Sequence, residues 1–380
     1  MPTILVSGVL ANKPHNGGNA WTRLSWVTGF RRLGFNVVFV EQLAGGADVG
    51  ECTQYFRTVM ASFGLTGSSA LLDATGERLE GLAPDRVKDA ARSAEMLFNI
   101  SGHLKLDEVR AGPRLRVYFD DDPGYTQFWY AQGHAGLELA GHDFYYTVGM
   151  NVGAQDCPIP AGGIPWRHTR PPVVLEDWPV APSGVAAPER VRFTTVASWR
   201  GPYGPVTYDG RTYGQKVHEF RKCIDLPRRV PADFELALDI HPAEANDLGL
   251  LRDNGWRLAD PKRVASTPEA FAQYVRGSSA EFSVAQGTYV DTRSGWFSDR
   301  TTRYLASGRP ALVQDTGFSG HVSCGEGLLT FRTVEEAAEG ARRIAADYAL
   351  HCAAARAVAE RYFDSDRVLG RLLDEVGVRG

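Results

Sequence analysis

The segment from Thr292 to Phe318, TRSGWFSDRTTRYLASGRPALVQDTGF, concentrates residues that could bind a phosphorylated ligand. Ser298 opens a predicted helix that ends at Gly308, and good capping residues stand at its start. A helix N-terminus carries a partial positive charge, so with hydroxyl and guanidinium groups it can hold a diphosphate. The loop after the next predicted strand can accept hydrogen bonds from sugar hydroxyls through its aspartate. The ligand-binding residues that we expect in this segment are Arg293, Ser298, Arg300, Thr301, Asp315, Thr316 and Gly317.

A second candidate is the glycine-rich loop His15-Asn16-Gly17-Gly18-Asn19, between a predicted strand and a predicted helix. Adjacent glycines let backbone N–H groups approach an anion, and the helix N-terminus adds to the attraction. The loop does not match the G-x-G-x-x-G dinucleotide fingerprint. Gly17 and Gly18 are therefore predicted either to contact the anionic part of a bound ligand or to form a plain tight turn.

Strands and helices alternate along the chain and must position these loops. Buried strands are predicted for residues 3–8, 35–40, 96–100, 115–119, 192–197, 234–240, 282–284 and 311–313. This alternation predicts an α/β protein with doubly wound parallel sheets. His103 and Asp122 follow two of these strands, and open sheets of this class bind ligands at their strand ends.

The composition excludes several classes of protein. The chain has 380 residues, 43% of them hydrophobic and 23% charged, so it is not intrinsically disordered. A net charge of −4 argues against a nucleic-acid partner. The five scattered cysteines include no C-x-x-C pair, which favours reduced thiols over a zinc site. We find no signal-peptide pattern and no run of ~20 apolar residues, and so expect a cytoplasmic protein with no membrane partner.

The order of these parts resembles that of the GT-B glycosyltransferases. Leu305 to Val313, LASGRPALV, matches the turn through Gly-x-Pro that leads from the family's donor-binding helix into a hydrophobic strand. Gly325 to Leu329 and Thr333 to Ala337 are similar to the Gly-Leu-Leu strand and the Glu-Glu-Ala helix that follow. The stretch from Arg31 to Val37, with Gly17-Gly18 ahead of its helix, is also similar, so the resemblance covers nearly the whole chain.

The resemblance implies two Rossmann-like domains that face a central cleft. It assigns residues 1–170 to an acceptor-binding domain, 171–190 to a proline-rich linker, 191–350 to a nucleotide-sugar-binding domain, and 351–380 to a C-terminal helix that crosses back to the first domain. Such enzymes generally need no metal, because basic side chains and a helix dipole neutralise the diphosphate. We expect no cofactor besides the nucleotide-sugar co-substrate. The D-x-D pattern in Asp120-Asp121-Asp122 lies far from the donor segment and is not predicted to bind a metal.

The resemblance also points to two further donor-binding residues and one departure. Arg200 stands where retaining members carry a diphosphate-binding arginine. Lys216 could be their accompanying lysine, displaced by a predicted hairpin at 206–213, although a solvated lysine is the alternative. Where retaining enzymes often carry two glutamates, this chain has Gly295 and Arg303. The stereochemical outcome of transfer is therefore left open.

An inverting transferase needs a base to deprotonate the acceptor hydroxyl. His15, in the first loop, is the leading candidate, followed by Asp122 and His103 at neighbouring strand ends. We predict a metal-independent glycosyltransferase that moves a sugar from a nucleoside-diphosphate sugar to a small-molecule hydroxyl in natural-product biosynthesis. A homodimer is compatible with the sequence. A nucleotide-sugar 2-epimerase and a non-catalytic nucleotide-sugar-binding auxiliary protein stay open as alternatives.

Overall fold

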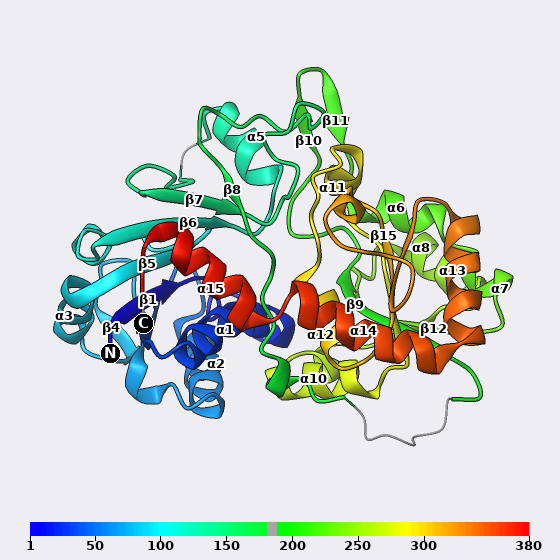
Figure 1. Cartoon of the computed structure of the whole chain (residues 1–380), viewed down its shortest axis with the longest axis horizontal. Helices are drawn as coiled ribbons and strands as arrows, with labels where there is room; N and C mark the ends of the chain where they lie inside the picture. The colour runs from blue at the N-terminus through cyan, green and yellow to red at the C-terminus, as the bar shows by residue number, and fades with distance from the viewer. Residues whose placement is uncertain (135, 181–187, 380) are drawn as a thin grey trace.

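The computed structural model describes residues 1–134, 136–180 and 188–379, and it contains two parallel sheets (Figure 1). The N-terminal sheet has eight strands in the order β4-β3-β2-β1-β5-β6-β7-β8, and only β4 is antiparallel to its neighbour. Its strands are β1 (Thr3–Ser7), β2 (Asn36–Gln42), β3 (Ser69–Leu72), β4 (Arg78–Gly81), β5 (Ala94–Ile100), β6 (Leu115–Asp120), β7 (Phe144–Thr147) and β8 (Arg167–His168). The strands predicted in this half are confirmed, with ends that differ by a few residues at most.

The C-terminal sheet has six strands, all parallel, in the order β13-β12-β9-β14-β15-β16. They are β9 (Arg192–Ser198), β12 (Asp233–Asp239), β13 (Arg257–Ala259), β14 (Ala280–Ser283), β15 (Ala311–Gln314) and β16 (Leu328–Phe331). The predicted hairpin is also present, as β10 (Val206–Tyr208) and β11 (Arg211–Tyr213). In each sheet the strands are added first on one side and then on the other side of the first strand, β1 or β9. The predicted doubly wound α/β class requires this strand order. Of the predicted linker, residues 181–187 lie outside the described residues.

Helices connect the strands of both domains. In the N-terminal domain they are α1 (Gly17–Arg32), α2 (Val49–Ser62), α3 (Pro84–Ser93), α4 (Asp107–Arg110) and α5 (Tyr125–Ala131). In the C-terminal domain they are α6 (Lys216–Lys222), α7 (Leu226–Arg229), α8 (Ala245–Asp253), α9 (Pro261–Val264), α10 (Pro268–Gly277), α11 (Gly287–Asp291), α12 (Asp299–Ala306), α13 (Val334–Ala346) and α14 (Tyr348–Tyr362). The last helix, α15, spans Ser365–Val376. None of the described helices has the length and apolar character needed to span a bilayer.

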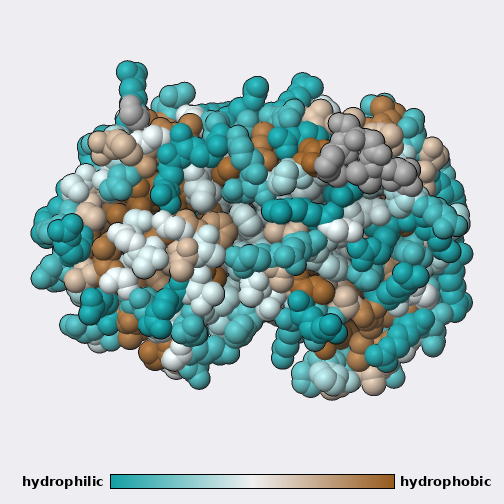
Figure 2. All heavy atoms as spheres, turned by 90° about the horizontal axis from the view of Figure 1, so that it is seen from below, coloured by the Kyte–Doolittle hydropathy of each residue, from teal (hydrophilic) through white to brown (hydrophobic). Residues whose placement is uncertain are grey.

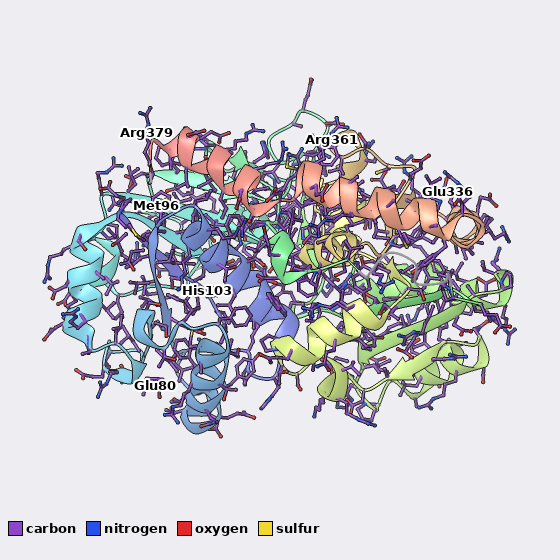
Figure 3. All side chains as sticks on the ribbon, turned by 60° about the horizontal axis from the view of Figure 1, so that its bottom comes forward. Glu80, Met96, His103, Glu336, Arg361 and Arg379 are labelled. Carbon is purple, nitrogen blue, oxygen red and sulfur yellow. The ribbon has the colours of Figure 1, made fainter. Side chains whose placement is uncertain are left out.

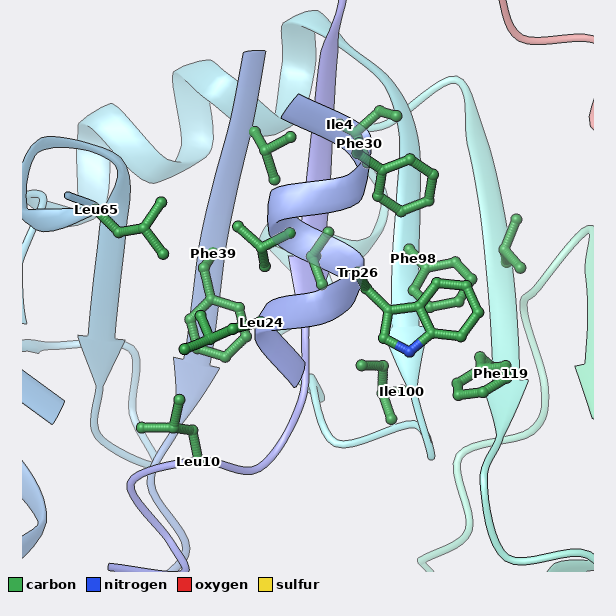
Figure 4. Packing of buried hydrophobic residues seen from close by; sticks show 14 of the residues in the cluster. Ile4, Leu10, Leu24, Trp26, Phe30, Phe39, Leu65, Phe98, Ile100 and Phe119 are labelled. Carbon is green, nitrogen blue, oxygen red and sulfur yellow. The ribbon is translucent and has the colours of Figure 1, made fainter. Parts of the chain in front are cut away.

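The core of the N-terminal domain forms on both faces of its sheet, because successive strand residues point to opposite sides. Ile4 of β1 packs toward α1, whereas its neighbour Leu5 packs toward α3. On the α1 face, Trp26 lies between Phe98 and Phe119, at ring-centroid distances of 4.5 and 4.6 Å (Figure 4). These rings anchor α1, and with it the glycine-rich loop at its N-terminus, to the sheet.

The chain returns to the N-terminal domain at its end. After α14, which covers the C-terminal sheet, α15 packs against α1, and the passage can be followed from Arg361 to Arg379 (Figure 3). Leu369 is fully buried in the N-terminal core with three other α15 residues, Leu372, Leu373 and Val376. The helices approach so closely that a Cβ on Gly29 would lie 2.4 Å from Cδ1 of Leu369. The chain thus passes between the two domains twice, once between β8 and β9 and again before α15.

The contacts that hold the domains together include two sets. In the first, N–H of Gly17 donates to the carbonyl of Ala265 at 2.8 Å, and Trp21 Nε1 donates to the carbonyl of Pro268 at 2.8 Å. In the second, the β10–β11 hairpin packs on α5, where the rings of Phe128 and Tyr213 stack with centroids 4.9 Å apart. The outer surface seen from below is mostly hydrophilic, with small scattered hydrophobic patches (Figure 2).

The contact between α15 and α1 yields a stability prediction. Replacing Leu369 by alanine should lower the free energy of unfolding by about 2–4 kcal/mol, because it leaves a cavity in a closely packed core. Leu350 on α14 is 43% exposed, so Leu350→Ala is a matched control that should cost less than about 0.5 kcal/mol. Urea titration followed by tryptophan fluorescence measures both. Equal effects of the two substitutions would contradict the placement of α15 in the core.

Candidate active site

A cavity of about 690 Å³ lies between the two domains. The β1–α1 loop and the end of β6 line it from one side, and the end of β9, α6, α9 and the start of α12 line it from the other. The charged and histidine side chains that line it are Lys13, His15, Arg23, Glu51, Asp121, Asp122, Lys216, Asp239, Lys262, Asp299 and Arg300. Several of these follow the carboxyl ends of parallel strands, where α/β proteins bind their ligands.

The β1–α1 loop is shaped by a buried carboxylate. Glu41, at the end of β2, accepts hydrogen bonds from the backbone N–H groups of Leu10, Ala11 and Asn12 at 2.7–2.9 Å. Asn12 adds its side-chain amide at 2.8 Å. Burial raises the pKa of Glu41, and these four N–H donors oppose that rise. The loop that carries Lys13 and His15 therefore leaves the sheet in one fixed direction.

His15, the first candidate base, lies at the rim of the cavity. Its Nε2 is 3.0 Å from Oε1 of Glu51, and both side chains are at least half exposed. Its backbone has φ of 56°, in the left-handed region that few non-glycine residues adopt. His103, the third candidate, is exposed and is absent from the lining, although it is close enough to the lining residues Arg23, Asp121 and Lys13 for their charges to act on it.

Gly17 and Gly18 serve the domain contact more than an anion site. The N–H of Gly17 already donates to Ala265, and a Cβ on Gly17 would lie 2.1 Å from the carbonyl oxygen of Thr267. A Cβ on Gly18 would lie 3.1 Å from the ring of Phe271, although Gly18 does line the cavity. The Gly17 N–H is therefore already occupied in this arrangement, and a contact of Gly17 with the donor stays a prediction.

The three aspartates at the end of β6 have three different environments. Asp120 is fully buried and accepts hydrogen bonds from Thr126, Gln127 and Thr147 at 2.7–2.8 Å. Asp121 forms an ion pair with Arg23 of α1 at 2.9 Å. Asp122 accepts one hydrogen bond at 2.7 Å, from the Tyr289 hydroxyl of the other domain. Only Asp121 and Asp122 line the cavity.

Asp122 has the electrostatic character of a proton acceptor. Burial and the neighbouring Asp121 carboxylate raise its pKa above the usual range, and the Tyr289 hydroxyl opposes that rise. No described residue donates a hydrogen bond to its second oxygen, Oδ2. Among the described residues there is no group of three or more His, Cys, Asp or Glu side chains that could hold a metal ion.

Lys216, at the start of α6, enters the cavity without an ion-pair partner among the described residues. Burial and the positive charge of Arg300 lower its pKa to about 7. A partly buried amine in a cavity, with its charge uncompensated, is typical of a site that awaits an anion. Lys216 is therefore not the solvated helix residue that was its alternative, and its binding of a ligand stays a prediction.

Arg300 also lines the cavity, but it is largely engaged within its own domain. Its Nε donates to Glu281 at 2.6 Å, its Nη1 to the carbonyl of Val196 at 3.0 Å, and its Nη2 to Ser283 at 2.5 Å. Glu281 is fully buried, so this ion pair is needed to hold its charge. The hydrogens that remain on Nη1 and Nη2 are what Arg300 can offer to a ligand.

Seven other predicted donor residues are absent from the lining of the cavity. Arg200 is exposed and pairs with Glu244. Asp315 pairs with Arg332 at 2.8 Å and accepts a hydrogen bond from the Gly317 N–H at 2.9 Å. The five others that lie outside the lining are Arg293, Ser298, Thr301, Thr316 and Gly317.

Local geometry explains these absences. Arg293 is exposed at φ of 50°, and its carbonyl accepts a hydrogen bond from the Asn151 side chain. Ser298 and Thr301 are buried beneath the start of α12, beside a separate small void. The Thr316 hydroxyl donates to the carbonyl of Trp296. At the start of α12, Asp299 and Arg300 line the cavity, whereas Ser298, Thr301 and the loop after β15 contribute to packing between elements.

The sequence interpretation missed several lining residues. Arg23 lies in the middle of α1, where sequence alone gives no reason to separate it from Arg31 and Arg32. Asp299 accepts from Thr22 of α1 at 2.5 Å and pairs with Arg303 at 2.6 Å, which joins the domains beside the cavity. The buried Arg303 thus occupies, with its own counter-charge, a position where a glutamate was expected from the resemblance.

Comparison with known proteins supplies a fold but no sequence family. No protein-family model and no curated protein matches the chain. The structure superposes on Anabaena HepE in complex with UDP-glucose with a TM-score of 0.58 and 13% identity, over 99% of both chains. It is similar to AviGT4, a glycosyltransferase involved in avilamycin A biosynthesis, with a TM-score of 0.56 and 13% identity over 99% of this chain and 97% of that one.

Sucrose-phosphate synthase from Thermosynechococcus elongatus is a third similar structure, with a TM-score of 0.56 and 12% identity over 99% of both chains. At these identities the likeness concerns the arrangement of the backbone. It extends over both sheets and the helices between them, in agreement with the strand orders described above. The chain therefore has the GT-B fold, with two Rossmann-like domains that face a central cleft.

Proposed function

We propose that the chain is a glycosyltransferase that moves a sugar from a nucleoside-diphosphate sugar to a hydroxyl of a small-molecule acceptor. The observation that carries the proposal is the cavity between the domains, where the unpaired Lys216 faces Asp121 and Asp122 across the cleft. Structures of HepE with UDP-glucose and with UDP favour a uridine nucleotide as the first donor to test. A role in natural-product biosynthesis draws support from the likeness to AviGT4.

Lys216 and Arg300 would bind the diphosphate. A diphosphate carries two negative charges in the donor and a third on the leaving group, so cations in a partly dry site stabilise the transition state more than the ground state. Lys216 gains a full charge when the anion binds, because the anion raises its pKa from about 7. Arg300 contributes a fixed charge held by Glu281. In this proposal these side chains, without a metal, neutralise the leaving group.

Asp122 would take the proton of the acceptor hydroxyl. It is a partly buried residue of the cavity wall, its pKa is raised, and its Oδ2 is free of described partners. His15 with Glu51 is the second candidate, since a histidine oriented by a carboxylate is also a competent base. Asp122 is preferred because His15 lies at the exposed rim.

Donor binding is tested by calorimetric titration with UDP, TDP and GDP. Lys216→Met should weaken binding of the preferred diphosphate by about 1–3 kcal/mol, because one charged hydrogen bond is lost. Its fold should survive: the Lys216 pKa is lower in the folded than in the unfolded state, so at pH 7 the charged form opposes folding. Lys216 is a cleaner target than Arg300, whose loss would leave buried Glu281 unpaired.

The control for this titration is Lys88→Met. Lys88 lies on α3, away from the cavity, and pairs only with Glu108, which is 72% exposed. Its substitution should leave the affinity for the diphosphate unchanged. If none of the three diphosphates binds the unaltered protein, the proposed donor site is wrong. If Lys216→Met binds as tightly as the unaltered protein, the assignment of Lys216 is wrong.

The lowered pKa of Lys216 also predicts a pH dependence of donor binding. Above a pH of about 7 the amine is largely neutral in the free protein, and a bound diphosphate restores its charge. Binding should then take up a proton, and affinity should fall by up to about tenfold per unit as pH rises above about 7. Titrations with UDP-glucose in buffers of different ionisation enthalpy measure the uptake. Lys216→Met should abolish it; an undiminished uptake in that variant would contradict this source of the proton.

The assignment of the base is tested by Asp122→Asn and His15→Ala. UDP release from UDP-glucose is followed with a panel of hydroxylated small molecules, and with water as the reference acceptor. Asp122→Asn should lower kcat by about 10²-fold or more, with UDP affinity nearly unchanged, because a general base typically contributes that much. His15→Ala should lower kcat less than about tenfold. The reverse order of effects would assign the base to His15 and Glu51.

A further inference from the structure

The single described hydrogen bond to the Asp122 carboxylate comes from the other domain. Tyr289 belongs to α11 of the C-terminal domain, and its hydroxyl donates to Asp122 Oδ1 at 2.7 Å. Asp122 follows β6 of the N-terminal domain, 167 positions earlier in the chain. The bond therefore exists only while the two domains are in contact. Burial and the Asp122 charge hold the pKa of Tyr289 well above its usual range, so Tyr289 remains a donor at neutral pH.

Tyr289 is held rigidly in this position. Its ring stacks on Trp296 with centroids 4.6 Å apart, and it meets Tyr125 of α5 edge-on at 6.1 Å. The start of α11 is fixed against the hairpin insert, because the Thr288 N–H donates to the carbonyl of Gly214 at 3.0 Å. A Cβ on Gly287 would lie 2.9 Å from that same backbone. The hydroxyl of Tyr289 thus points at one place, and the packing of α11 determines it.

The same hairpin that supports α11 also binds the N-terminal domain. Beyond the stacking of Phe128 on Tyr213, Gln132 at the end of α5 donates to the carbonyl of Thr207 at 2.7 Å. Tyr203, just before the hairpin, packs on Trp129 at 4.8 Å. Closure of the domains at this side of the cavity and formation of the Tyr289–Asp122 bond therefore occur together.

Other charged and titratable groups also face Asp122. Asp121 raises its pKa, and the cations Lys13 and Arg23 lower it. From the C-terminal domain, Lys216 lies close enough for mutual influence, as does the Tyr203 hydroxyl. Arg23 is already paired with Asp121, so its positive charge is largely neutralised by that carboxylate. Among the described side chains, Tyr289 alone donates a hydrogen bond to the carboxylate.

We propose that Tyr289 is a positioning residue that orients Asp122 as a base, so that the base is complete only when the two domains are closed. The inference rests on the proposed function. With Oδ1 held by Tyr289, Oδ2 is directed to the acceptor and takes the proton of its hydroxyl. The acceptor oxygen then forms a bond to the anomeric carbon, and the bond from that carbon to the diphosphate oxygen breaks. Its electron pair leaves with the nucleoside diphosphate.

The test compares Tyr289→Phe with Tyr125→Phe. Tyr125 is an equally buried ring of the same cluster, but its hydroxyl contacts Thr288 at 3.4 Å rather than Asp122. Tyr289→Phe should lower kcat about tenfold or more while KM for UDP-glucose changes less than about twofold. The acid limb of the pH profile should move to higher pH, because a carboxylate that loses a hydrogen-bond donor binds its proton more tightly. Tyr125→Phe should change neither.

A stability measurement separates this proposal from the proposed function. Asp122→Ala, Tyr289→Phe and the double variant are unfolded in urea. If the bond joins the domains, the effects on the unfolding equilibrium constant should be non-additive by about threefold or more. Additive effects would overturn the bond. Non-additive effects with an unaltered pH profile and kcat would overturn the positioning role. If the unaltered protein binds no nucleoside diphosphate, the proposed function fails, and the positioning role with it, whereas the contact between the domains is judged by the urea data.

Discussion

The carboxylate of Glu41 determines the geometry on which the cavity depends. By accepting the backbone N–H groups of three successive residues, Leu10 to Asn12, it fixes how the chain leaves β1. The loop then reaches α1 with Gly17 in place against the carbonyls of Ala265 and Thr267. A buried carboxylate without such donors would cost several kcal/mol, so loop and charge stabilise each other. The path of the β1–α1 loop along the cavity, the contact of Gly17 with the other domain and the position of His15 at the rim all depend on this arrangement.

The sequence was sufficient for the fold because its signals are local. Hydrophobic strands, glycine stops and the Gly308-Arg309-Pro310 turn depend on neighbours in the chain, and the structure contains the elements that they predict. The site was only partly predictable, because ion pairs between distant residues decide which charges stay available. Arg200 is taken by Glu244, and Asp315 by Arg332. No periodicity in a sequence reveals such pairings.

Lys216 and Arg23 show one cavity residue that the sequence pointed to and one that it did not. Lys216 was identified through its position in a resemblance, and the structure adds the physical reason for interest: a partly buried amine that forms no ion pair with any described residue. Arg23 was missed, since its role depends on the meeting of α1 with the end of β6. Likewise, the presence of Arg303 in place of a glutamate is explained only by its contact with Asp299, which also accepts a hydrogen bond from Thr22. There a buried cation and its partner connect the domains where a carboxylate was expected.

The position of α15 has a consequence for how the protein folds during its synthesis on the ribosome. Leu369, Leu372, Leu373, Val376 and Val378 complete a core whose other buried members lie in the first 150 residues. The N-terminal domain therefore lacks this part of its core until the C-terminal domain has been translated. During this interval the exposed apolar surface can attract chaperones or other nascent chains. The order of the two domains along the chain and the order of their final assembly therefore differ, because α15, translated after the C-terminal domain, completes the core of the N-terminal domain.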